Sequence, residues 1–401
     1  MPILPDYHDF SGRHWETAAI RNHLAYRGYQ APHTGEPYTE ALMMGVSGGA
    51  VMGYFSFAYE GHDPMCRILT RNTFDPLETM LSRLGCVQEN VRTAGLDRAN
   101  ANLADALASG VPPVAWADAY SLGYNGHGET PDMWMMTPIL VYGIDEATGE
   151  ALVADRAAVP FRVPAADLLA ARGRVKKEKH RLLTLGPPNP DKLVSAVQAG
   201  IWDCIRLYTE APPHGTKNNF GLQAFRYWAE LLTRPKARLS WARVFPPGVE
   251  MFSGLRGAYH SIHLFDGFRH AERGLYADFL EEAARILDNA SLQGAAAAFR
   301  KTIPAWDALG LALLPEDPEP FNEARELLER RDRLFVNEGA AALDEILACD
   351  ARLSEIRAAM ETDFPLTEPE VETLRAGLAE KILALHDVEE EAVRVLIEAM
   401  G

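Results

Sequence analysis

The proline-rich segment Gly186-Pro187-Pro188-Asn189-Pro190 separates two parts of this 401-residue chain that have different residue patterns. Before it, helical and strand-like patterns alternate, whereas almost every later segment has apolar residues at helical spacing. A chain of this length is long enough for two domains. We therefore predict an α+β domain over residues 1–185 and a mostly helical domain over residues 186–401, with further C-terminal helices from about residue 320.

The composition limits the classes of partner. Hydrophobic residues make up 47% of the chain and charged residues 24%, which is ordinary for a globular protein. The net charge of −17 disfavours binding to nucleic acid or to an anionic membrane, because both need clustered lysine and arginine. The four cysteines show no CxxC spacing, the chain does not open with a signal-peptide pattern, and no apolar run is long enough to cross a bilayer. We expect a cytoplasmic protein.

The first part of the chain contains the elements of an α+β domain. Apolar residues at helical spacing predict a helix that starts near His14 or Trp15 and ends before Gly28. Three buried strands and a hairpin turn follow, with the strands at residues 113–118, 139–144 and 151–155 and the turn at residues 145–150. The order is therefore a helix and then an antiparallel sheet.

Four short motifs in this part resemble those of a known family. His14-Trp15-Glu16-Thr17 resembles an opening His-Cys-Glu-Ser/Thr motif, with tryptophan in place of cysteine; the others are Leu24 to Gly28, Thr39 to Gly49 and Asp118 to Tyr124. Together they resemble the N-terminal domain of the butirosin biosynthesis protein H (BtrH-like) family, which has a papain-like, cysteine-peptidase-like fold. Residues 219–229 and 274–283 resemble that family's helical companion domain.

The resemblance implies a site with a cysteine at a helix N-terminus, a histidine base, and an aspartate or asparagine that orients the histidine. Such a site is taken to transfer an acyl group from an acyl carrier protein to an amine through an acyl-thiol. Here Trp15 stands at the cysteine position and Thr137 at about the histidine position. Asp155 occupies the position of the third residue. A second interpretation of Asp155 is a turn residue at the end of a strand. Removing one member of a nucleophile–base pair abolishes most of its catalysis.

The first functional hypothesis is therefore a catalytically degenerate homologue that binds a small molecule, a peptide or an acyl carrier protein in the vestigial cleft. Trp15 would fill that cleft or give a ligand a flat apolar floor. The glycine turn after residue 46 allows the backbone to approach a ligand closely. The expected binding residues are His14, Trp15, Glu16, Ser47, Gly48 and Tyr124.

The second hypothesis is an active acyl- or amide-transfer enzyme that uses other residues; an unrelated α+β protein is the third. The resemblance brings eight polar candidates near the cleft: His14, Glu16, Thr17, Ser47, Tyr54, Tyr124, His127 and Thr137. His127 could be a base for Thr137 or Ser47. However, the glycines of Asn125-Gly126-His127-Gly128-Glu129 favour an exposed loop residue over a preorganised base.

No metal or cofactor is expected. The twelve histidines include no HExxH motif, and His260 with His263 is an isolated pair at i and i+3. The glycine turn matches neither GxxxxGK[ST] nor GxGxxG, the two patterns that hold phosphates.

The C-terminal part predicts helices at residues 322–335, 340–360 and 368–400, the last with Thr367 as its N-cap. The last helix carries an apolar stripe at helical spacing: Leu374, Leu378, Ile382, Leu385, Val388, Val393 and Ile397. Because its opposite side is acidic, the stripe favours a core or helix-pair contact, such as a homo-oligomer interface, over a membrane-binding face.

Overall fold

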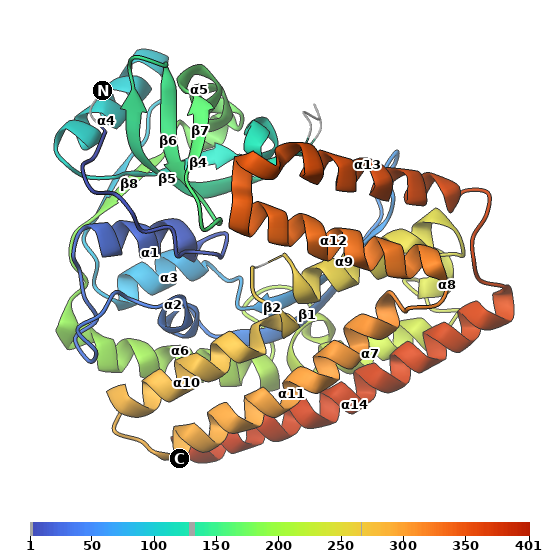
Figure 1. The fold of residues 1–401 in the computed structure, drawn as a ribbon. Coiled ribbons are helices and arrows are strands. Elements are labelled where there is room, and N and C mark those ends of the chain that lie inside the picture. Colours follow the sequence, from blue (N-terminus) through green and yellow to red (C-terminus); the bar gives the residue numbers. More distant parts are fainter. Residues whose placement is uncertain (1–2, 128–132, 266) are drawn as a thin grey trace. The chain divides into compact units, whose positions relative to one another are not determined.

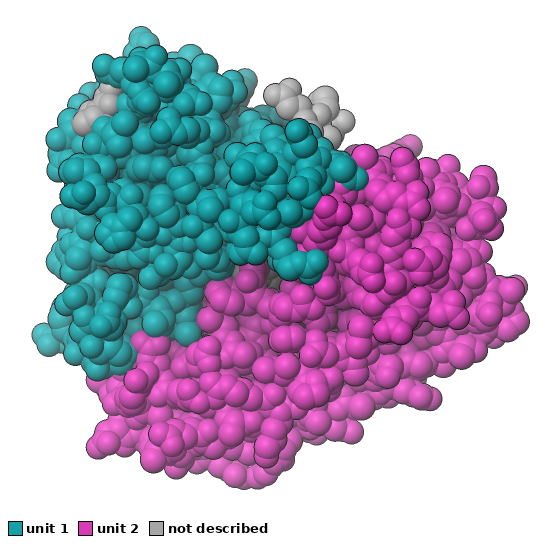
Figure 2. Space-filling view, viewed as in Figure 1, with its two compact units in different colours: residues 1–43, 80–193, 331–348 teal, residues 44–79, 194–330, 349–401 magenta. Residues whose placement is uncertain are grey.

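The chain forms two compact units, and both are discontinuous in sequence (Figure 2). In the computed structural model, residues 3–127, 133–265 and 267–401 are described. Unit 1 comprises residues 1–43, 80–193 and 331–348, and unit 2 comprises residues 44–79, 194–330 and 349–401. These units group residues by spatial contact, so the division by sequence after residue 185 stays a prediction.

Unit 1 contains an antiparallel sheet whose strand order is β3-β8-β4-β5-β6-β7 (Figure 1). Strands β4 and β5 lie in its middle and are buried almost throughout, as a strand covered on both faces must be. The edge strand β7 alternates buried and exposed residues instead. The bounds are β3 Gln88–Val91, β4 Val114–Asp118, β5 Met136–Asp145, β6 Glu150–Ala154, β7 Phe161–Pro164 and β8 Leu182–Leu185.

The predicted strands and hairpin of this region are confirmed. The β5–β6 turn falls between Asp145 and Glu150, as the polar residues and glycine of that link predict. Gly143 of β5 has a steric role, because a Cβ there would lie 2.9 Å from the backbone of Ile3. The N-terminal segment crosses the strand at this point, where the Leu4 N–H donates to the Tyr142 carbonyl oxygen at 2.9 Å.

Helix α1 (Thr17–Tyr26) packs against strands β5 and β4 within unit 1. It begins two residues after Trp15, slightly later than the sequence predicts, but its first hydrogen bond joins the Ala18 N–H to the His14 carbonyl oxygen at 3.0 Å. The helix ends as predicted: Gly28 has a φ of +68°, a left-handed conformation that glycine adopts without steric cost.

The other helices of unit 1 also pack on the sheet. Helix α5 (Ala165–Gly173) contacts β4, β6 and β7, and helix α4 (Leu96–Ala108) contacts β8. Residues 331–348 add the end of helix α12 (Glu319–Glu338) and the start of helix α13 (Leu343–Ala359) to this unit. They approach the sheet near Phe161, whose ring lies 5.6 Å from that of Phe335.

Unit 2 contains a two-stranded antiparallel sheet and most of the helices. Strands β1 (Ala50–Phe57) and β2 (Met65–Arg71) pair with each other, and α7 packs on β1 while α9 packs on β2. Sequence-distant helices α11 and α14 run side by side (Figure 1). Helices α2 (Glu40–Val46) and α3 (Pro76–Arg83) have residues in both units. The bounds of the other helices are α6 Leu193–Thr209, α7 Gly221–Thr233, α8 Trp241–Val244, α9 Val249–His263, α10 Arg273–Ile286, α11 Ser291–Leu313 and α14 Glu368–Met400.

The predicted stripe of helix α14 lies largely in the core of unit 2, where the helix packs against α11 and α7. Leu378, Ile382, Leu385 and Val393 are buried, whereas Val388 and Ile397 are exposed. The predicted N-cap is present as a capping box: the Thr367 side chain accepts the Glu370 backbone N–H, and the Glu370 carboxylate accepts the Thr367 N–H at 2.7 Å.

The structure is thus α+β, with antiparallel sheet in the N-terminal region and a mostly helical C-terminal region, as predicted. Among the described residues, no helix is both long enough and apolar enough to cross a membrane.

Candidate functional site

A buried carboxylate holds the segment that precedes helix α1. Glu40 accepts the backbone N–H of Arg13 at 2.7 Å, the N–H of His14 at 3.1 Å and the hydroxyl of Thr17 at 2.6 Å. A negative charge is favourable here because the helix N-terminus carries a partial positive charge. The sequence analysis did not single out Glu40, although it lies in the Thr39 to Gly49 motif.

The Trp15 side chain lies against an arginine that the sequence analysis also missed. The guanidinium carbon of Arg156 is 3.8 Å from the centroid of the half-buried Trp15 ring and 5.0 Å from that of Phe335. This is the geometry of a cation–π contact. Nothing in the sequence marked Arg156, since a basic residue after a strand is common.

Two acceptors fix the Arg156 guanidinium over the ring. Its Nε donates to Asp155 at 3.1 Å, and its Nη2 donates to Asp155 at 3.2 Å and to the Asn125 side-chain oxygen at 2.7 Å. Nη1 makes no hydrogen bond within the described part of the chain. The arginine side chain as a whole is 13% exposed.

Asp155 therefore has a role beyond that of a strand-end residue. Besides the Arg156 backbone N–H, at 2.8 Å, its carboxylate accepts the Tyr124 hydroxyl at 3.0 Å. Burial, together with the neighbouring Asp155 charge, raises the pKa of Tyr124 well above its ordinary value. Tyr124 therefore keeps its proton and is a hydrogen-bond donor to Asp155, and its ring stacks on that of Phe161 with 4.0 Å between centroids.

We call Trp15, Tyr124, Asn125, Asp155 and Arg156 the Trp15–Arg156 cluster. Every member lies in unit 1. The cluster contains Trp15, Tyr124 and Asp155 from the sequence predictions, and it adds Arg156 and Asn125.

Thr137 lies on strand β5, opposite Ala117 of β4. Its hydroxyl is buried and has no hydrogen-bond partner within the described residues. Asp155 directly follows Ala154, which pairs with Leu140 of β5, three residues along that strand from Thr137.

His127 is not the exposed loop residue that its glycine neighbours favour. It is half-buried, its ring lies 5.1 Å from that of Tyr120, and its Nδ1 is 3.4 Å from Nη2 of Arg331. Burial, and then the charges of Arg331 and Arg156, lower the pKa of His127 to about 4. The ring is therefore neutral at pH 7 and a weak base, while residues 128 and 129 of the same predicted loop lie outside the described residues.

The remaining predicted residues near Trp15 have structural contacts. The Nδ1 atom of the buried His14 accepts the Glu16 N–H at 3.2 Å, so Nδ1 carries no proton in this arrangement. Glu16 is the N-cap of α1 but makes no side-chain capping bond.

Ser47, Gly48 and Tyr54 belong to unit 2, whereas the Trp15–Arg156 cluster belongs to unit 1. The Ser47 hydroxyl donates to the Met44 carbonyl oxygen at 2.7 Å, and the Tyr54 hydroxyl accepts the Trp241 indole N–H at 3.0 Å. Gly48 has a φ of +119°, which fits the predicted turn.

Three of the cysteines, Cys66, Cys86 and Cys204, are poor sources of a reactive thiolate. All four cysteines are buried and free of disulfides. Burial raises the pKa of Cys86 to about 12 and that of Cys204 to about 12, and it raises the pKa of Cys66 further. A thiol becomes a nucleophile only when its pKa is lowered, which requires nearby positive charge and access to solvent.

One comparison with known proteins identifies the N-terminal region. The family model described as butirosin biosynthesis protein H, N-terminal, matches residues 14–156, about a third of the chain. The match begins at His14 and ends at Arg156, so it includes the whole Trp15–Arg156 cluster. No curated protein matches the chain. Residues 14–156 therefore match the butirosin biosynthesis protein H N-terminal family, which confirms the resemblance that the opening motif predicts.

Proposed function

We propose that this protein is a catalytically degenerate homologue of BtrH-type acyltransferases, which binds an acyl thioester or its carrier protein without transferring the acyl group. The observation that carries the proposal is the guanidinium of Arg156, which lies 3.8 Å over the Trp15 ring. In the family's pattern the position of Trp15 is that of the nucleophilic cysteine. A stacked tryptophan and arginine cannot form an acyl-thiol.

The other polar candidates support the same conclusion. The Thr17 hydroxyl donates to Glu40, and the Tyr124 hydroxyl donates to Asp155. The low pKa of His127 makes it a poor base at neutral pH, since a general base works best when its pKa lies near the working pH. The geometry therefore favours binding over group transfer.

The Trp15–Arg156 cluster has the parts of a small binding site. The half-buried indole offers an apolar surface, and Nη1 of Arg156 offers a charged hydrogen-bond donor beside it. Asp155 and Asn125 hold the guanidinium in place, so little side-chain freedom is lost on binding. The fitting ligand has an acceptor, such as a thioester carbonyl or a carboxylate, next to an apolar chain.

Titration with a butyryl-loaded acyl carrier protein and with free butyryl-pantetheine tests the proposal. We expect binding by isothermal calorimetry without release of free thiol above the buffer rate. R156M should weaken binding at least about 10-fold, the loss of one charged hydrogen bond. R162M is the matched control, because Arg162 is an exposed arginine of unit 1 that pairs with Glu150 at 3.2 Å, and it should bind as the parent does.

Two outcomes would contradict the proposal. Thiol release or covalent acylation by the parent protein, lost in T137V or H127Q, would establish the active enzyme instead. Equal binding by the parent and R156M would remove the Trp15–Arg156 cluster as the site. Acylation of W15C/T137H, detected by intact-protein mass, would add support, since it would show that only the two missing side chains prevent the chemistry.

A further inference from the structure

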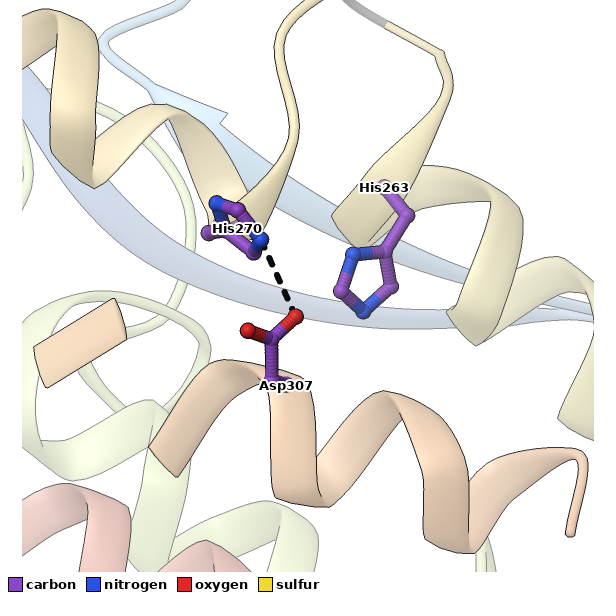
Figure 3. A group of neighbouring side chains, drawn as sticks. All are labelled: His263, His270 and Asp307. Carbon is purple, nitrogen blue, oxygen red and sulfur yellow. Dashed lines mark ion pairs between the residues drawn. The ribbon is translucent and has the colours of Figure 1, made fainter. Parts of the chain in front are cut away.

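Three side chains of unit 2 form a group that the sequence analysis did not find. They are His263 at the end of helix α9, His270 in the turn before α10, and Asp307 in helix α11. One ligand atom from each lies within 4.8 Å of the other two. Figure 3 shows both imidazole rings beside the Asp307 carboxylate, and His270 Nε2 is 3.0 Å from its Oδ1.

His263 has no hydrogen bond that accounts for its burial. Its residue is only 3% exposed, and neither ring nitrogen has a hydrogen-bond partner within the described residues. Buried polar atoms are nearly always paired, so an unpaired imidazole needs an explanation. Helix α11 makes room for the ring at Gly310, where a Cβ would lie 2.0 Å from His263 Nε2.

One cation lies near this group, and it would repel a bound metal ion if it were not paired with a carboxylate. The nearby Arg269 cation is itself paired, since its Nη2 lies 3.0 Å from the Glu329 carboxylate.

The turn that carries His270 is fixed by contacts of the residues that follow it. His270, Ala271 and Glu272 all have left-handed φ angles, 58°, 49° and 62°. Such backbone is costly for residues other than glycine and persists only where the surroundings enforce it. Here the buried Glu272 pairs with Arg71, and the buried Arg273 donates to the Ala271 carbonyl oxygen at 2.7 Å. His270 is therefore presented to Asp307 by a fixed segment.

We propose that His263, His270 and Asp307 form a binding site for a divalent transition-metal ion, with zinc as the best fit. Two imidazole nitrogens and one carboxylate are a ligand set that zinc and related ions prefer. The side chains of His270 and Asp307 are 26% and 44% exposed, so the ion has an entry path and water completes its coordination. The site is independent of the Trp15–Arg156 cluster and of the proposed binding function.

The geometry requires only a small adjustment. With bonds of about 2.0–2.1 Å, tetrahedral zinc ligands lie roughly 3.3 Å apart. The His270 Nε2 and Asp307 Oδ1 atoms are already 3.0 Å apart, and the ligand atom of His263 lies within 4.8 Å of both residues' ligand atoms, so a small shift of its ring completes the set. The ion would replace the His270–Asp307 contact by two metal bonds and would give the buried His263 a bonding partner.

Titration of the full chain, stripped with EDTA, tests the site. We expect one Zn²⁺ per chain by calorimetry, and a Co²⁺ absorption band of the intensity typical of four-coordination. D307N should lower the affinity more than about 100-fold, which exceeds the effect of losing a supporting contact. H263Q should do the same, and D307N keeps the test valid if H263Q does not fold, because Asp307 is partly exposed.

Two matched controls address other sites. H260Q changes a histidine on the same helix but outside the group, and D387N disrupts a second cluster, His386, Asp387 and Glu390 on helix α14. Both should bind Zn²⁺ as the parent does. The proposal is overturned if the parent does not bind at one to one, if D307N binds as tightly as the parent, or if either control loses binding as fully as D307N.

Discussion

The two units each contain an arginine that lies over a tryptophan ring and pairs with a carboxylate. In unit 1, Arg156 is 3.8 Å from the Trp15 centroid and 3.1 Å from Asp155. In unit 2, Arg273 is 5.0 Å from the Trp306 centroid and 2.7 Å from Glu389. The same three residue types thus occur twice in one chain.

The two groups differ in how many N–H donors of the arginine make hydrogen bonds within the protein. Arg273 and Glu389 are 0% exposed, and all five N–H donors of Arg273 are used, on Glu389, the Tyr208 hydroxyl and the carbonyl oxygens of residues 51, 70 and 271. Glu389 in turn accepts the Trp306 indole N–H at 2.8 Å and the Tyr208 hydroxyl at 2.6 Å. We call Arg273, Glu389, Tyr208 and Trp306 the Arg273–Glu389 cluster.

The two arginines therefore differ in how many of their N–H donors are already used within the protein. Burial opposes the charged form of Arg273, but the Glu389 carboxylate and the hydrogen bonds raise its pKa above the ordinary value. A cation with every donor used has nothing left for a partner. The Arg156 side chain is 13% exposed and its Nη1 makes no hydrogen bond to a described residue, which is the feature on which the proposed binding function depends.

The largest effect is expected from Arg273→Met. The substitution leaves a buried carboxylate without its cation and four other acceptors without a donor. Breaking a buried pair in this way costs about 3–5 kcal/mol. Urea unfolding followed by circular dichroism measures the loss.

Two further variants sharpen this result. R273M/E389L should be more stable than R273M alone, because it removes the uncompensated charge. R394M removes two exposed ion pairs of helix α14, with Glu391 and Glu398, and should leave stability unchanged. If R273M lowered the free energy of unfolding by less than about 1 kcal/mol, the Arg273–Glu389 cluster would not be the structural charge network described above.

A smaller loss is expected from Arg156→Met, about 1–2 kcal/mol, the cost of one cation–π contact and of weaker pairing for Asp155. Asp155 keeps two hydrogen bonds in this variant, from Tyr124 and from the backbone N–H of residue 156. The same urea experiment applies. If R156M destabilised the protein as strongly as R273M, both clusters would be structural.

The smallest effect is a change in pH dependence at His127. Its pKa is lowered from the ordinary 6.5 to about 4, so below pH 6.5 the unfolded chain takes up a proton that the folded chain refuses until about pH 4. Stability should therefore fall as the pH drops from 6.5 to 4. The contribution is less than about 1 kcal/mol per pH unit, because the ring is only partly buried.

His127→Gln should reduce this slope without abolishing it. His23 remains, and burial lowers its pKa in the same direction. The charged groups that act on His127 are Arg331, Arg156 and Asp118, so R331M should raise its pKa and flatten the slope as well. Melting temperatures measured at several pH values decide this; an unchanged slope in H127Q would contradict the prediction.

Local patterns predicted most of the elements but not their partners. The β5–β6 hairpin, the capping box at Thr367 and the C′ glycine Gly28 each depend on residues close in sequence, and all are confirmed. Helix α1 starts slightly later than expected, and the residues before it donate to Glu40 from another segment, a contact that no local pattern predicts. His127 is half-buried because Arg331 and Tyr120 cover it, which its glycine-rich neighbours cannot reveal.

Residue patterns were enough to predict the α+β class, the family match of residues 14–156 and the absence of cysteine at position 15, because periodicity, turn residues and motifs are local properties. The contact of Arg156 with Trp15 and the approach of His263, His270 and Asp307 became evident from the folded chain alone. These contacts join residues from separate elements whose approach depends on packing of the whole unit, and no short pattern encodes that packing.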